Sequence, residues 1–190
     1  MPNWCLTSYI ATGDGKEVRD LYEKMKSLEN SEKFFVENNF GKTLLGNLVS
    51  ILGGDWTKID CRGEFFDLRI DDDEGALRFE TTTAWCEPKH LRQLIQSKYP
   101  SLDIYYRTEE PCMGYFKTND ADGEYFPELI KIENWNGDPE YYETWEEVFQ
   151  IVAAKTDTTI LNIDEMQRVL QAYNEEHKDA KIYVYQFTIE

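Results

Sequence analysis

Cys86 and His90 are the residues whose types and spacing best suit nucleophilic chemistry. The cysteine precedes Glu87 and Pro88 at the predicted start of a helix, where the positive end of the helix dipole can lower a thiol pKa. A histidine four residues further on could supply the base that such a nucleophile needs. Glu87 opposes the effect of the dipole, however, and no third group that would orient the histidine can be assigned. A catalytic role for Cys86 is therefore not predicted.

Two acidic segments carry the oxygen ligands that hard cations prefer. In the run Asp71–Glu74, four carboxylates share one short turn and are expected to point apart into water. The segment Thr118–Gly123 partly imitates a calcium-binding loop, because two aspartates and a glycine fall at positions 3, 5 and 6 of the motif. Position 12 would be Leu129, where such a loop needs a carboxylate. This segment is better interpreted as a hairpin turn, and neither segment is predicted to bind a metal.

The four cysteines, Cys5, Cys61, Cys86 and Cys112, are far apart in the sequence. Zinc and iron–sulfur sites usually draw their thiolate ligands from close pairs, and this chain has no such pair. Reduced thiols in a reducing compartment are therefore expected. Motifs for phosphate binding, dinucleotide binding, metalloprotease activity and serine hydrolysis are also absent. The sequence thus predicts no catalytic residues, no cofactor and no metal.

Periodic hydrophobic patterns predict the elements that surround these residues. Strands are expected at 4–11, 64–71, 77–83 and 102–106, and helices at 16–28, 44–52 and 88–99. Further along, 113–117 and 124–132 read as a hairpin, followed by helices around 145–152 and 163–173 and a last strand at 181–189. The alternation in the second strand is read as Phe66, Leu68 and Ile70 facing one way against Asp67 and Arg69.

This order predicts an α+β fold: a ferredoxin-like β-α-β-β-α-β core with an inserted helix and a C-terminal β-α-α-β extension. Residues 1–134 would form the ferredoxin-like domain with its hairpin extension. Residues 135–190 would form a helical extension with the final strand, packed on the same domain. No 20-residue apolar stretch or secretory signal appears, so a cytoplasmic protein without a membrane partner is expected.

Several short segments together resemble a known family. They are Pro2–Cys5, Leu45–Gly46, Leu52–Trp56, Cys61–Gly63, Leu77–Phe79, Thr81–Trp85, Tyr99–Leu102, Glu109–Pro111 and Gly123–Pro127. The chain resembles an uncharacterised ferredoxin-like family of phage, plasmid and gut-bacterial mobile-element proteins, over about residues 2–130. The resemblance implies a fold and a link to mobile elements. It implies no activity, because the family carries no established catalytic residues.

Acidic charge is concentrated in the middle of the chain. The net charge is −17, and residues 103–147 contribute −10 of it, with 13 acidic and 3 basic side chains. The same residues are rich in aromatic side chains, so a surface that selects a basic protein partner is one hypothesis. The alternative is that the aromatic residues face the core and the acids only contact water. Direct binding of nucleic acid through this segment is not expected, because it would repel phosphates.

The sequence therefore favours a non-enzymatic accessory protein of a mobile element that binds another protein. The candidate partner surface consists of Asp120, Asp122, Glu124, Glu128, Trp135, Tyr141 and Tyr142. One alternative is a DNA mimic that inhibits a host nuclease or DNA-binding protein. Another is a small-ligand binder or an enzyme with a pocket between the sheet and its extension. The oligomeric state stays open.

Overall fold

A computed structural model describes residues 3–31, 35–36, 41–71, 75–134 and 137–190. The chain divides into two compact units, Met1–Asn119 and Asp120–Glu190. The division falls after Asn119, whereas the sequence analysis placed its domain boundary after residue 134. Each unit has its own hydrophobic core, and each combines strands with helices. The α+β class expected from the sequence is therefore confirmed.

The N-terminal unit is built on an antiparallel sheet. Its strands are β1 (Trp4–Thr12), β2 (Gly63–Asp71), β3 (Ala76–Ala84), β4 (Asp103–Glu110) and β5 (Tyr115–Thr118). They pair in the order β2-β3-β1-β4-β5. Consecutive strands β2 and β3 are joined by a hairpin, whereas β1 lies between two strands that come much later in the chain. A short 3-10 turn, η1 (Pro111–Met113), leads from β4 into β5.

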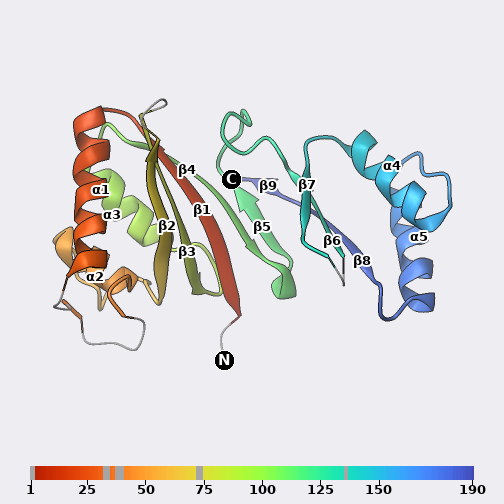
Figure 1. Ribbon diagram of the computed structural model, residues 1–190, viewed down its shortest axis with the longest axis horizontal. Helices are drawn as coiled ribbons and strands as arrows, with labels where there is room; N and C mark the ends of the chain where they lie inside the picture. The colour runs from red at the N-terminus through yellow and green to blue at the C-terminus, as the bar shows by residue number, and fades with distance from the viewer. Residues whose placement is uncertain (1–2, 32–34, 37–40, 72–74, 135–136) are drawn as a thin grey trace. The chain divides into compact units, whose positions relative to one another are not determined.

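Three helices cover one face of this sheet (Figure 1): α1 (Gly15–Asn30), α2 (Leu45–Ile51) and α3 (Lys89–Lys98). The apolar stripe that predicted α1 is its buried face, which includes Val18, Leu21 and Met25. Asp14 caps this helix, and its carboxylate accepts a 2.9 Å hydrogen bond from the backbone N–H of Lys16. Across the sheet, the rings of Tyr9 and Phe79 stack with their centroids 4.8 Å apart. Burial of these faces against each other forms the larger core.

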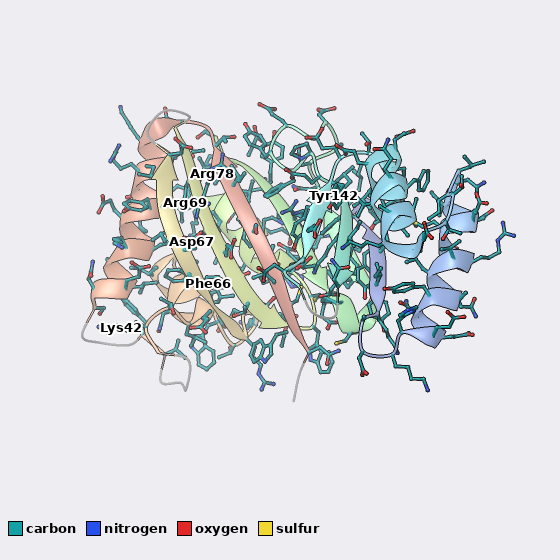
Figure 2. The ribbon with its side chains drawn as sticks, turned by 45° about the vertical axis from the view of Figure 1, so that its right-hand side comes forward. Lys42, Phe66, Asp67, Arg69, Arg78 and Tyr142 are labelled. Atoms are coloured by element: carbon teal, nitrogen blue, oxygen red, sulfur yellow. The ribbon has the colours of Figure 1, made fainter. Side chains whose placement is uncertain are left out.

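A β-bulge in β2 changes which of its side chains face the core. The pairing with β3 shifts between Phe66 and Arg69, and Asp67 has a positive φ of 50°. Phe65 is buried and Phe66 exposed before the bulge, and the extra residue shifts the alternation so that Leu68 and Ile70 after it pack against the same core as Phe65. The prediction that Phe66 and Leu68 share one face is therefore wrong, because strict alternation does not allow for a bulge. Figure 2 shows Phe66, Asp67 and Arg69 along this strand.

The C-terminal unit is a three-stranded antiparallel sheet with two helices on one face (Figure 1). Its elements are β6 (Ile130–Asn134), β7 (Glu140–Tyr142), α4 (Trp145–Thr156), α5 (Ile163–Glu176), β8 (Ile182–Gln186) and the short β9 (Thr188–Ile189). The strand order is β7-β6-β8. Thr144 and Glu147 form a capping box that fixes the start of α4. Ile132, Val148, Val152 and Met166 are among the side chains of its core.

The expected hairpin between 113–117 and 124–132 is not formed. β5 pairs with β4 instead, and β6 pairs with β7 and β8 in the other sheet. Residues 124–129 belong to no strand, and β7, which the sequence analysis did not predict, completes the second sheet. The two apolar runs have the right length and spacing for a hairpin, but alternation alone does not say which strand is the partner.

No helix in the described residues is long and apolar enough to span a membrane.

Candidate functional site

A cavity of about 870 Å³ lies within the N-terminal unit. It is enclosed by the residues just before and within α2, the loop from Trp56 to Arg62, and the segment that joins β3 to α3. The apolar part of its wall includes Val36, Leu44, Ile59, Cys61, Ala84 and Pro88. Small-molecule and peptide sites typically have such a volume and a mainly apolar wall. The cavity is therefore the candidate functional site of this unit.

Two tryptophans line this cavity and remain about half exposed. Trp56 is 45% exposed and Trp85 is 48% exposed, although both are large apolar side chains. A tryptophan indole left in water at the wall of a cavity offers a large, rigid contact surface at a small cost in conformational entropy. Such residues are commonly the strongest contributors to a binding interface.

The backbone of Trp85 is held in a strained conformation. Its φ is +76°, a region that bulky L-residues rarely adopt. The Trp85 N–H donates to the carbonyl of Asn3 at 3.0 Å, and the Thr83 hydroxyl donates to the carbonyl of Cys86 at 2.7 Å. These bonds on both sides fix the turn and direct the indole to the cavity. A strained residue that its surroundings hold in place is a frequent sign of a functional site.

Beneath this turn lies a buried polar network centred on Glu87. Its carboxylate accepts hydrogen bonds from the Tyr9 hydroxyl at 2.8 Å and from Nε of Arg92 at 2.9 Å. The Arg92 guanidinium also lies 4.7 Å from the centre of the Tyr106 ring. Burial, together with the Glu87 carboxylate, raises the pKa of the Tyr9 hydroxyl well above its ordinary value of 10.0. The network anchors the β3–α3 segment to the sheet. The Tyr9 hydroxyl, the Glu87 carboxylate and the Arg92 guanidinium are all engaged with one another in it.

Cys86 and His90 both line the cavity, so the fold brings the pair singled out in the sequence to one site. Burial raises the pKa of the Cys86 thiol above 9.0, and the carboxylates of Glu87 and Asp60 raise it further. Within the described residues, neither the thiol nor the imidazole has a hydrogen-bond partner. A nucleophilic cysteine needs a lowered pKa or an oriented base. The geometry provides neither to Cys86.

The other cysteines are structural or isolated. Cys5 is fully buried and lies 3.0 Å from the Thr108 hydroxyl, and burial raises its pKa from 9.0 to about 11. Cys61 is buried in the cavity wall, which also raises its pKa. All four thiols are free. In the part of the chain that the structure describes, no three His, Cys, Asp or Glu side chains lie close enough to hold a metal ion.

The acidic half of the predicted partner surface is divided between the interior and the exterior of the C-terminal unit. Asp120 is 1% exposed, and its carboxylate accepts backbone hydrogen bonds from Glu124, Tyr125 and Phe126 at 3.2, 2.7 and 2.7 Å. This aspartate therefore organises the loop and is not displayed to a partner. Asp122 and Glu124 are exposed, and Glu128 is half-buried.

The aromatic half of that surface is only partly displayed. Tyr141 and Tyr142 are half-buried, and the Tyr141 ring packs against Phe187 with a centroid distance of 6.4 Å. Tyr142 donates its hydroxyl hydrogen to Glu140, and burial with this bond raises the Tyr142 pKa to about 12. Trp135 lies outside the described residues, as do Asp72, Asp73 and Glu74 of the acidic turn.

No protein-family model matches this chain, and no curated protein does.

No pattern in the sequence predicted the cavity. Trp56 and Trp85 belong to two of the segments that resemble the known family, and both lie outside the periodic stretches. The available signal is their setting: each tryptophan lies in a loop, with Gly53, Gly54 and Asp55 before Trp56. A large apolar side chain in a polar, glycine-rich loop lies outside the periodic positions that face the core. It is therefore a candidate contact residue.

Proposed function

We propose that this protein is a non-enzymatic binding protein that holds another protein, and that the cavity lined by Trp56 and Trp85 is its binding site. One observation carries the proposal: two half-exposed indoles line a mainly apolar cavity of about 870 Å³, and one of them is held there by a strained backbone. Strain of this kind costs about 1–3 kcal/mol, which a function in recognition would explain. The raised pKa of Cys86 favours binding over covalent catalysis.

The proposal includes a ferredoxin-like topology for the N-terminal unit. It is supported by the antiparallel order β2-β3-β1-β4, with α1 between β1 and β2 and with α3 between β3 and β4. We further propose that the protein is an accessory protein of a mobile genetic element, as its family-like segments imply. A cytoplasmic location is part of the proposal, and the free, exposed thiols of Cys86 and Cys112 are compatible with a reducing compartment.

The test is affinity capture from a lysate of the organism that carries the gene. The bait is the wild-type protein, a Trp56→Ala/Trp85→Ala variant, or a Trp4→Ala control, whose tryptophan is 43% exposed in the same unit but does not line the cavity. The captured partner is then purified and titrated by calorimetry. The loss of one hot-spot tryptophan typically weakens binding by about 30-fold, so the double variant should bind at least that much more weakly than the wild type. The Trp4→Ala control should bind like the wild type. Equal affinity of the cavity variant, or no enriched partner, would overturn the proposal.

A second candidate function is suggested by the charge of the C-terminal unit. This unit contains 17 acidic and 5 basic residues, a net charge of −12 out of −17 for the chain. In residues 120–147 the only basic residue is Lys131, which is 2% exposed, so the exposed charges of this segment are all acidic. Seven of its acids are exposed: Asp122, Glu124, Asp138, Glu140, Glu143, Glu146 and Glu147.

An exposed surface of one sign could mimic the phosphates of DNA and block a host nuclease or DNA-binding protein. Binding of this kind should weaken steeply as salt is added. The matched variants would replace Glu140, Glu143 and Glu146 by Gln, with the cavity left intact. Affinity that does not change with salt or with these substitutions would remove this candidate, without affecting the first.

A further inference from the structure

The exposed charges of the cavity are mainly positive, in contrast to the rest of the chain. Arg62 and Lys89 line the cavity and are exposed, as is the neighbouring His90, while Asp60 is the one exposed carboxylate of its described lining. The second acid of the lining, Glu87, is buried and engaged by Arg92 and Tyr9. Within the described residues, neither Arg62 nor Lys89 has an ion-pair partner. In a protein with a net charge of −17, two exposed basic side chains at one cavity with no ion-pair partner among the described residues need an explanation.

The backbone that carries Arg62 is fixed in position. The Ala84 N–H donates to the carbonyl of Arg62 at 3.0 Å, which ties the start of β2 to the end of β3. The next residue, Gly63, has a φ of +156°, and a Cβ there would lie 1.9 Å from the carbonyl oxygen of Thr82. Only glycine permits this close approach. The base of the Arg62 side chain is therefore held next to Trp85, which follows Ala84 in the same cavity wall.

The start of α3 adds to the positive potential. Lys89 and His90 are its first residues, the N-cap is Pro88, and no side chain caps the helix. Its first turn contains no acidic residue. The nearest carboxylate, Glu87, precedes the N-cap and is paired with Arg92, so it opposes the positive end of the dipole only in part. The helix end alone would not define a site. Together with the cavity and the exposed Arg62 and Lys89 side chains, it favours a negatively charged occupant.

We infer that the occupant is a segment of a partner protein in which carboxylates flank an apolar anchor residue. The inference rests on the proposed function and specifies its partner. The anchor would enter the cavity and contact Trp56 and Trp85, while the flanking acids would pair with Arg62 and Lys89. The basic side chains at the cavity favour acidic residues next to the anchor. The apolar wall favours a ligand with an apolar side chain over a small anion that has none. A pair of complementary surfaces of this kind sets specificity and the rate of encounter as well as affinity.

The experiment uses an array of peptides of about eight residues, in which Phe, Leu, Trp or Ile anchors are flanked by Glu and Asp, by Lys and Arg, or by Ser and Gly. The intact protein should bind the acidic set at least about tenfold more tightly than the basic set, and added salt should weaken binding. An Arg62→Glu/Lys89→Glu variant should lose this preference. The control, Lys16→Glu/Lys98→Glu, makes the same change of charge at exposed positions outside the cavity and should keep it.

The outcomes separate the inference from the function on which it rests. If the purified partner needs both tryptophans but binds the Arg62→Glu/Lys89→Glu variant as tightly as the wild type, the proposed function holds and the acidic partner is wrong. A preference for basic or uncharged peptides overturns the inference as well, as does the absence of binding to any peptide of the array. If the wild-type protein self-associates and the Arg62→Glu/Lys89→Glu variant does not, the acidic segment belongs to a second copy of this chain. That result would overturn the inference of a different partner protein.

Discussion

Glu87 and Arg92 form a buried ion pair, with Nε of the arginine 2.9 Å from Oε1 of the glutamate and side-chain exposures of 3% for Glu87 and 13% for Arg92. The pair spans the junction at which the β3–α3 segment becomes helix, and the Tyr9 hydroxyl donates to the same oxygen. The walls of the cavity therefore depend on a charge pair that is almost completely removed from water. Breaking one half of such a pair is more costly than replacing both halves.

We predict that Glu87→Gln lowers the free energy of unfolding by about 3–5 kcal/mol, because the arginine is left buried without its counter-charge. A Glu87→Met/Arg92→Met double variant should lose much less, since it removes both charges and keeps the volume. Denaturant unfolding of the three proteins measures both effects. If the double variant is as unstable as Glu87→Gln, the pair is not the source of the loss.

Trp85→Gly is expected to separate stability from binding. Glycine adopts a φ of +76° without strain, so this variant should unfold with a free energy equal to that of the wild type or up to about 1 kcal/mol higher. Partner binding should fall by an order of magnitude or more, because the indole is lost. Trp85→Ala is the matched control, which loses the same indole but keeps the strain. If the glycine variant is the less stable of the two, strain at this position is refuted.

Iodoacetamide should modify Cys86 more slowly than free cysteine at pH 8. The thiol pKa is raised by burial and by the carboxylates of Glu87 and Asp60, so less thiolate is present at that pH. Asp60→Asn should increase the rate modestly, because it removes the smaller of the two acidic contributions. Mass spectrometry of the labelled peptide gives both rates. A native Cys86 that reacts faster than free cysteine would revive a nucleophilic role.

Stability should fall as the pH rises from about 9 to about 11, in part through Cys5. Its pKa is 9.0 ordinarily and about 11 in the fold, so the folded state holds the proton more tightly. The contribution is complete below about pH 9 and is lost as the pH rises through the folded value, by about 2–3 kcal/mol in total. Unfolding of a Cys5→Ser variant, which keeps a hydroxyl near Thr108, should depend less steeply on pH in this range. Parallel curves for the two proteins would exclude Cys5 as a contributor.

Asp120 and Asp122 should behave differently although they are two residues apart. Asp120→Ala leaves three backbone N–H groups without their acceptor, and we expect it to destabilise the C-terminal unit by about 2–4 kcal/mol. Asp122→Ala, at an exposed position, should change stability by less than about 0.5 kcal/mol. Thermal unfolding of both variants makes the comparison. Equal losses would mean that Asp120 does not organise its loop.

The elements with clear periodicity could be predicted from the sequence. The spacing of Val18, Leu21 and Met25 predicted α1, because the apolar stripe of an amphipathic helix is buried against the core. Phe66 was placed wrongly because a bulge depends on the partner strand, which the local pattern does not reveal. The run at 124–132 was assigned to the wrong neighbour for the same reason: alternation predicts a strand but does not identify its pair.

The candidate site was harder to predict than the fold. Cys86 and His90 were recognised as neighbours, yet the burial and the nearby carboxylates that raise the thiol pKa depend on tertiary structure. Asp120 was taken for a surface acid because nothing in the sequence tells an aspartate that binds water from one that binds three backbone N–H groups. The cavity is lined by two loops together with parts of α2, β3 and α3, so only the assembled chain shows that Trp56 and Trp85 share it.

The bulge in β2 also bears on how this protein avoids self-aggregation. β2 is the edge strand of its sheet, and its outer edge makes a single described bridge, between Leu44 and Glu64. A flat, unpaired edge is a template on which another chain can add a strand. The kink at Asp67 and its ion pair with Arg69 place charges and an irregular backbone there instead. Straightening this strand by deleting Asp67 should therefore promote edge-to-edge fibre formation before it affects recognition at the cavity.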